Sequence, residues 1–75
     1  MDWDDELDAQ GLLCPLPVLK ARKRLKGLPA GAVLRVLATD PAAVIDIPHF
    51  CSESGHVLVG SGDIGPSQYY LIRRV

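Results

Sequence analysis

Two prolines one residue apart, Pro15 and Pro17, fix where the chain changes from an extended segment to a helix. They stand in the stretch "GLLCPLP", residues 11–17, directly before "VLKARKRLKGL". Proline suits the first turn of a helix, because its missing N–H has no intrahelical partner to lose. A helix is therefore predicted to start at Pro15, and Gly27 and Pro29 are expected to end it.

The predicted helix has an apolar side and a basic side. Five bases and no acid lie between residues 20 and 26. Such a run is either the solvated face of a surface helix or, through Lys20, Lys23 and Arg24, a docking surface that steers an acidic partner. Both interpretations stay open. The apolar residues recur at steps of three, four and three, which gives one stripe for packing: Val18, Ala21, Leu25 and Leu28.

The rest of the chain alternates strand and helix signals. Asp40 and Pro41 form an N-cap and first-turn pair. Pro48 is expected either to kink the second helix or to divide it into a turn near 41–45 and a helix at 48–54. The stretch "GSGDIGPS" is expected to be a loop. The predicted strands are residues 6–9, 32–38, 56–61 and 68–74.

This β-α-β-α-β-β order predicts an α/β (α+β) fold. Both helix stripes need one shared apolar surface, so the expected architecture is a two-layer α/β sandwich with two helices packed on one face of a four-stranded mixed sheet. At 75 residues the chain is expected to be a single domain, residues 1–75, and a monomer. Residues 1–5 are expected to be a loose acidic N-terminus.

The composition excludes several classes of protein. Two cysteines are too few for a disulfide scaffold. The acidic start "MDWDDELD" lacks the features of a signal peptide, and no apolar run is long enough to span a membrane. We therefore expect a cytoplasmic protein with reduced thiols. A net charge of −1 and few aromatic residues argue against stable nucleic-acid binding.

Cys14 stands just before the predicted helix. Because Pro15 follows it, Cys14 is biased to extended geometry, which holds its side chain near the unpaired N–H groups of the first turn. The helix dipole stabilises a thiolate there, and such cysteines have pKa values lowered to about 3.5–7.5. The alternative is a small buried hydrophobe. For Cys51, beside Phe50, a buried inert thiol is the favoured interpretation.

Other thiol chemistry finds little support. There is no nucleophile signature of a Cys–His hydrolase and no C-x-x-C pair. The spacing of His49, Cys51 and His56 matches no known zinc pattern, so we expect no metal and no cofactor. A lone activated thiol can accept a sulfur atom as a persulfide and hand it to another thiol, since this exchange needs only a good thiolate and access.

The stretch "LDAQGLLCPLPVLKARKRL" resembles the signature of the TusA/SirA-like sulfur-carrier family. The family's Gly-Leu-x-Cys-Pro-x-Pro core is matched by residues 11–17, and the resemblance continues through "ATDPAAVIDIPHFCSESGH" to "YYLIRR". It implies the same two-layer sandwich. It also implies that Cys14 carries the persulfide, with Gly11, Pro15 and Pro17 as the structural frame of the site. Where some family members carry an arginine between two aromatics, this chain has "SQYYLIRR", so a contact there is not carried over.

The leading hypothesis is a sulfurtransferase that acts as a persulfide carrier. The resemblance implies a cysteine desulfurase or rhodanese-type sulfur donor and a downstream acceptor protein, in tRNA thiolation, molybdenum-cofactor maturation or sulfur-oxidation trafficking. One alternative is a non-catalytic regulatory or RNA- or protein-binding module that uses the basic helix 20–26. Another is a redox-sensing thiol, which would form a Cys14–Cys51 bridge or a sulfenate.

Overall fold

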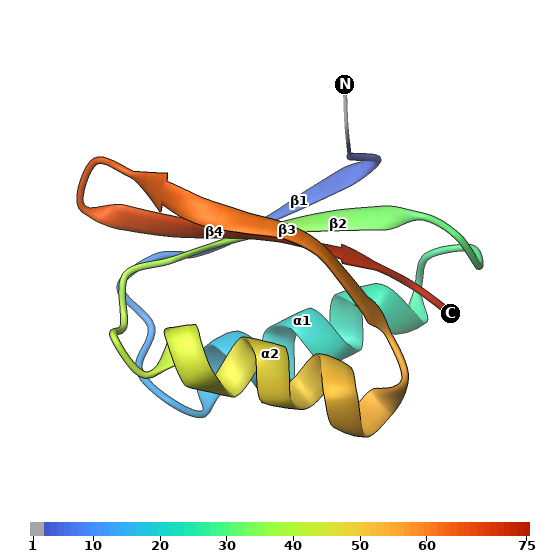
Figure 1. The fold of residues 1–75 in the computed structure, drawn as a ribbon, viewed down its shortest axis with the longest axis horizontal. Helices are drawn as coiled ribbons and strands as arrows, with labels where there is room; N and C mark the ends of the chain where they lie inside the picture. Colours follow the sequence, from blue (N-terminus) through green and yellow to red (C-terminus); the bar gives the residue numbers. More distant parts are fainter. Residues whose placement is uncertain (1–2) are drawn as a thin grey trace.

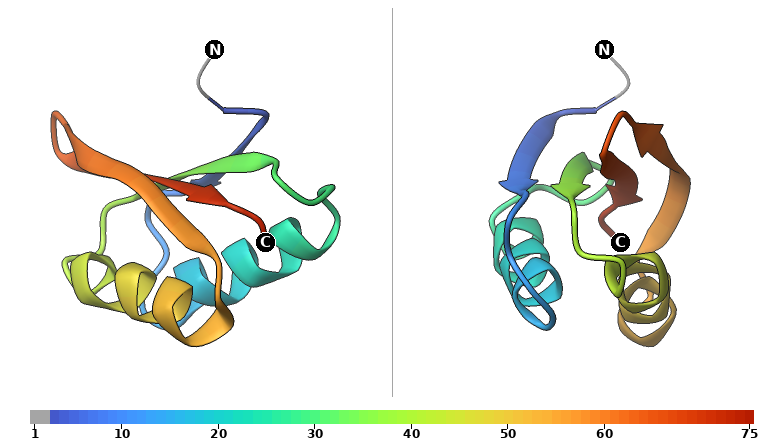
Figure 2. Two further views of the ribbon diagram at one scale, coloured as in Figure 1. Left: turned by 45° about the vertical axis from the view of Figure 1, so that its right-hand side comes forward. Right: turned by 90° about the vertical axis from the view of Figure 1, so that its left-hand side faces the viewer.

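The structure, a computed structural model, describes residues 3–75. Two helices cover one face of a four-stranded sheet (Figures 1 and 2), which confirms the predicted two-layer sandwich. The strand order is β1-β2-β4-β3; β1 and β2 are parallel, and the other pairs are antiparallel. In chain order the elements are β1 (Asp5–Ala9), α1 (Leu16–Lys26), β2 (Val33–Ala38), α2 (Ala43–Ser54), β3 (Val57–Ile64) and β4 (Ser67–Arg73).

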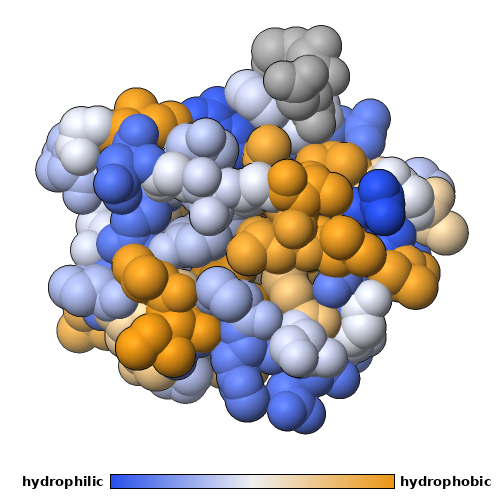
Figure 3. Space-filling view, viewed as in Figure 1, coloured by the Kyte–Doolittle hydropathy of each residue, from blue (hydrophilic) through white to orange (hydrophobic). Residues whose placement is uncertain are grey.

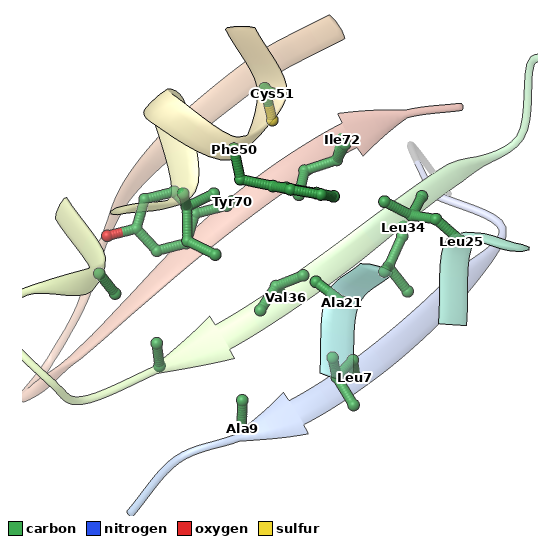
Figure 4. Packing of buried hydrophobic residues seen from close by; sticks show 13 residues of the cluster. Leu7, Ala9, Ala21, Leu25, Leu34, Val36, Phe50, Cys51, Tyr70 and Ile72 are labelled. Carbon is green, nitrogen blue, oxygen red and sulfur yellow. The ribbon is translucent and has the colours of Figure 1, made fainter. Parts of the chain in front are cut away.

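The core lies between the helices and the sheet (Figure 4). Alternate residues of β2 are fully buried, because successive side chains of a strand point to opposite faces. The predicted α1 stripe is confirmed: Ala21 and Leu25 are buried, and Val18 and Leu28 are partly buried against the core. The side chains of the core cluster are Leu7, Ala9, Ala21, Leu25, Leu34, Val36, Ala38, Ala43, Ile47, Phe50, Cys51, Tyr70 and Ile72.

The helix boundaries differ slightly from those expected. α1 begins at Leu16 rather than Pro15, with Pro15 as the N-cap residue and Pro17 in the first turn. The predicted division of the second helix at Pro48 is wrong, because α2 is one helix from Ala43 to Ser54. Pro48 removes one hydrogen bond, the one that Val44 would accept. That loss falls in the first turn of α2, at a residue that is well exposed.

The expected loop at residues 60–67 is also wrong. β3 continues to Ile64, and a two-residue turn of Gly65 and Pro66 leads into β4. Gly62, paired with Tyr69, has a packing reason to be glycine: a Cβ there would lie 2.7 Å from the Tyr69 ring. Gly62 therefore marks the close approach of a cross-strand aromatic ring rather than a loop.

The expected loose N-terminus is wrong for residues 3–5, while residues 1–2 lie outside the described part of the chain. Asp4 both donates to and accepts from the backbone of Val33, and Asp5 begins β1. The guanidinium carbon of Arg35 lies 4.3 Å from the centre of the Trp3 ring. Backbone pairing and this stacking hold the segment against the sheet.

None of the helices within residues 3–75 has the length and hydrophobicity to cross a membrane.

Candidate functional site

The loop that connects β1 to α1 presents Cys14 at the surface. Its backbone N–H donates a hydrogen bond of 2.6 Å to Oδ2 of Asp40, and the N–H of Gly11 donates to Oγ1 of Thr39 at 2.9 Å. Gly11 has φ +80°, a conformation that other residues rarely adopt. Two hydrogen bonds thus tie the Cys14 loop to the segment between β2 and α2.

The second carboxylate oxygen of Asp40 binds the segment that leads into α2. Oδ1 accepts a hydrogen bond of 3.1 Å from the N–H of Ala42, directly before α2. The prediction that Asp40 and Pro41 are the N-cap and first-turn residues of α2 is wrong, because Ala42 is the N-cap residue and the helix begins at Ala43. Asp40 instead closes a turn just before the helix, by bonding the backbone two residues further on. Asp40 therefore joins the start of α2 to the loop that carries Cys14.

A surface cleft of about 590 Å³ lies beside Cys14, between α1 and α2. Its floor includes Phe50, and the guanidinium carbon of Arg22 lies 5.6 Å from the centre of that ring. Positively and negatively charged side chains line the cleft. The residues that line the cleft are Cys14, Pro15, Val18 and Arg22 on one side, and Asp46, His49, Phe50 and Glu53 on the other.

The predicted lowering of the Cys14 pKa is wrong. The nearby Asp46 carboxylate, partial desolvation and the negative charge of Asp40 raise the pKa of the thiol above its ordinary value. The prediction considered only the N-terminus of α1. The structure adds two carboxylates from the segment around the start of α2, and nearby negative charge disfavours a thiolate.

The basic residues proposed for docking lie away from this cleft. Lys20, Lys23 and Arg24 line a second hollow of about 360 Å³ between α1 and β1, together with Leu7 and Gly27. Arg24 pairs with Asp5 at 3.1 Å, so part of the basic run holds the edge strand. Lys20 and Lys23 are exposed and keep a docking role open.

Sequence reasoning missed three residues around Cys14: Arg22, Asp40 as an anchor, and Asp46. Helical spacing carried a signal for Arg22, since Pro15, Val18 and Arg22 follow one another at steps of three and four along one face. The two acids come from another part of the chain and meet Cys14 only in the folded protein.

The second cysteine matches its prediction. Cys51 is 3% exposed within the core, and burial raises the pKa of its thiol. Both thiols are free. Across residues 3–75, no group of three His, Cys, Asp or Glu side chains is placed to hold a metal ion.

Comparison with known proteins agrees with this architecture. A solved structure, that of a SirA-like protein from Desulfitobacterium hafniense, superposes with a TM-score of 0.77 at 26% identity, covering 93% of this chain and 96% of that one. The two-helix, four-stranded arrangement is therefore a fold already seen in a SirA-like protein.

Sequence comparison identifies the family. A curated relative, the sulfur carrier protein TusA of Allochromatium vinosum, is 45% identical over 73 residues, which are 97% of this chain and 96% of that protein. The protein of the same name from Pseudomonas syringae pv. syringae is 46% identical over 71 residues, 95% of this chain and 84% of the relative. The family model described as sulfurtransferase TusA matches residues 5–74. The chain therefore belongs to the TusA family.

Proposed function

We propose that this protein is a sulfur carrier that accepts a sulfur atom on Cys14 as a persulfide and relays it to a downstream acceptor. The observation that carries the proposal is the contrast between its two free thiols: Cys14 is exposed beside a cleft, whereas Cys51 is 3% exposed in the core. Transfer between proteins needs a thiol that another protein can reach. Its curated relatives are named sulfur carrier proteins, which supports the same role.

The proposed chemistry conserves atoms and electrons. The Cys14 thiolate attacks the outer sulfur of a donor persulfide; the new S–S bond forms on Cys14 while the donor's S–S bond breaks. The donor leaves as a thiolate and takes up the proton that Cys14 lost. One persulfide and one thiol are exchanged for another such pair, so the step needs no external oxidant, reductant or cofactor.

The surroundings of Cys14 suit a transient protein partner. Large apolar side chains are exposed on both segments that flank it: Leu13 and Leu16 before and in α1, and Val44 and Ile45 in α2. Figure 3 shows the apolar group over the start of α2. Exposed apolar groups of this kind mark interaction surfaces. We propose a cysteine desulfurase or rhodanese-type donor and a protein acceptor, both meeting this monomer in the cytoplasm.

Whole-protein mass spectrometry tests the proposal. The reduced protein is incubated with a small persulfide donor, such as N-acetylcysteine persulfide, and the adduct is mapped by peptide analysis. We expect a mass gain of one sulfur atom on Cys14, no gain in Cys14→Ser, and an unchanged gain in Cys51→Ala. Loading of Cys14→Ser to the parent level, or loss of loading in a folded Cys51→Ala variant, would overturn the assignment.

A further inference from the structure

Asp46 is a carboxylate without a counter-ion at the edge of the Cys14 cleft. The other two acids there are engaged: Glu53 faces His49 at 3.8 Å, and both oxygens of Asp40 accept backbone N–H groups. Within residues 3–75, Asp46 forms no ion pair, and it lines the same cleft as Cys14. A negative charge beside the reacting sulfur is therefore uncompensated.

The cationic groups of the cleft do not supply the missing charge. Arg22, from α1, has its guanidinium carbon over the Phe50 ring and forms no salt bridge within the described part of the chain. His49, from α2, lies next to Glu53. The charged groups that face the Cys14 sulfur region are thus Asp40, Asp46, Glu53, His49 and Arg22, and the acids outnumber the permanent bases.

We propose that Asp46 is a latch on Cys14: its unpaired carboxylate, in the same cleft, opposes negative charge on the sulfur until a cationic side chain of the docking sulfur donor pairs with Asp46. The thiol proton then passes to water. This inference rests on the proposed function, because it assigns a control to the same thiol. The partner it requires is a protein that presents a lysine or arginine side chain close to its own persulfide.

Negative charge beside the sulfur lowers its reactivity, and such charge acts only over a short range in salt solution. Exchange at sulfur requires the thiolate, and Asp46 and Asp40 raise the pKa of Cys14, so the thiolate fraction of the free protein is smaller than that of free cysteine. A cation that pairs with Asp46 offsets this negative charge. Exposed charges are screened beyond about 10 Å at 0.1 M salt. A cation must therefore enter the cleft to act on Cys14, which favours reaction with docked partners.

Small disulfides that differ in charge test the latch without an identified partner. Cystamine carries an ammonium group near each sulfur, whereas hydroxyethyl disulfide is neutral. Each reacts with Cys14 by thiol–disulfide exchange, which gives a mixed disulfide and one free thiol. The measured quantity is the ratio of the two exchange rates at low salt, with the product mapped to Cys14 by mass spectrometry.

We expect this cationic-to-neutral rate ratio to fall about fivefold in Asp46→Asn, as for the loss of one close charge pair in water. Glu53→Gln removes the same charge from the same cleft without touching the sulfur and should keep the ratio. Asp46→Glu keeps the charge and should also keep it, which controls for misfolding. The ratio should fall as ionic strength rises.

An unchanged ratio in Asp46→Asn, or an equal fall in Glu53→Gln, would overturn the latch. Persulfide loading of the parent protein is measured separately, with a donor that carries no cation. Failure of the proposed function shows itself in that loading assay, whereas failure of the latch shows itself only in the charge dependence of exchange.

Discussion

The backbone N–H of Cys14 donates a 2.6 Å hydrogen bond to Oδ2 of Asp40, a residue 26 positions further along the chain. The backbone carbonyl of Asp40 accepts a hydrogen bond from Nε2 of Gln68 in β4. Asp40 therefore joins the Cys14 loop to the start of α2 and to the sheet. Supporting contacts of this kind hold a reactive group in place on rigid elements.

Replacing Asp40 should weaken the whole fold. Asp40→Ala removes the acceptor for the N–H groups of Cys14 and Ala42, and we expect a loss of about 1–2 kcal/mol in the free energy of unfolding. Denaturant unfolding measures it. Asp63→Ala is the control, because Asp63 is exposed at the far end of β3. Equal stability of the Asp40 and Asp63 variants would contradict the anchoring role.

The reactivity of Cys14 should rise with pH around a midpoint that is higher than that of free cysteine. Asp46 and Asp40 raise the pKa of the thiol, so the thiolate fraction at neutral pH is smaller than in free cysteine, whose pKa is about 8.5. Alkylation by iodoacetamide should rise with pH around a midpoint above that of free cysteine. Asp46→Asn removes the negative charge and should move the midpoint down. A parent midpoint below that of free cysteine would mean that the dipole of α1 outweighs the carboxylates.

The exposed lysines of α1 offer a test of docking. Reversing Lys20 and Lys23 to glutamate leaves the core untouched, and Arg24 is kept because it pairs with Asp5. If these lysines attract an acidic surface of the donor, sulfur transfer from a cysteine desulfurase that carries a persulfide should slow by about tenfold at low salt. The deficit should shrink at high salt, while alkylation of Cys14 by iodoacetamide stays close to the parent rate. Equal transfer rates of variant and parent at every salt concentration would mean that Lys20 and Lys23 are solvent-exposed residues without a docking role.

Two glycines of β3 should respond differently to alanine. Neither has a positive φ, but a Cβ on Gly62 would lie 2.7 Å from the Tyr69 ring, whereas a Cβ on Gly60 would lie at an ordinary 3.5 Å from Leu71. Gly62→Ala displaces the ring and should lower stability by about 0.5–1 kcal/mol through lost cross-strand packing. Gly60→Ala should have a smaller effect. Thermal unfolding compares them, and an equal or reversed order would contradict the packing role.

The local signals in the sequence were sufficient for the architecture. Proline and glycine at element ends, together with the apolar stripe of α1, predicted the order of elements and the layering. These signals act over a few residues, and turn chemistry is local. The position of Cys14 between a strand and a helix was predictable for the same reason.

The electrostatics of the site were not predictable in this way. The sign of the Cys14 pKa shift depends on Asp40 and Asp46, which reach the thiol only through the packing of α2 beside α1. Two backbone errors have a similar origin. From local signals alone, Gly62 is typical of a loop and Pro48 of a break in a helix. In the structure Gly62 lies opposite Tyr69 in the sheet, and the rest of α2 packs on the sheet around Pro48. Tertiary contacts override local preference at all of these positions.

A chase of radiolabelled sulfur determines whether Cys14 both receives and releases sulfur. The protein is loaded from a labelled persulfide donor, freed of the donor, and mixed with a second thiol protein. We expect label on Cys14 to pass to the acceptor and Cys14 to return to a free thiol, while Cys51→Ala behaves as the parent does. Label that never enters Cys14, or that stays there in the presence of the acceptor, would contradict this role.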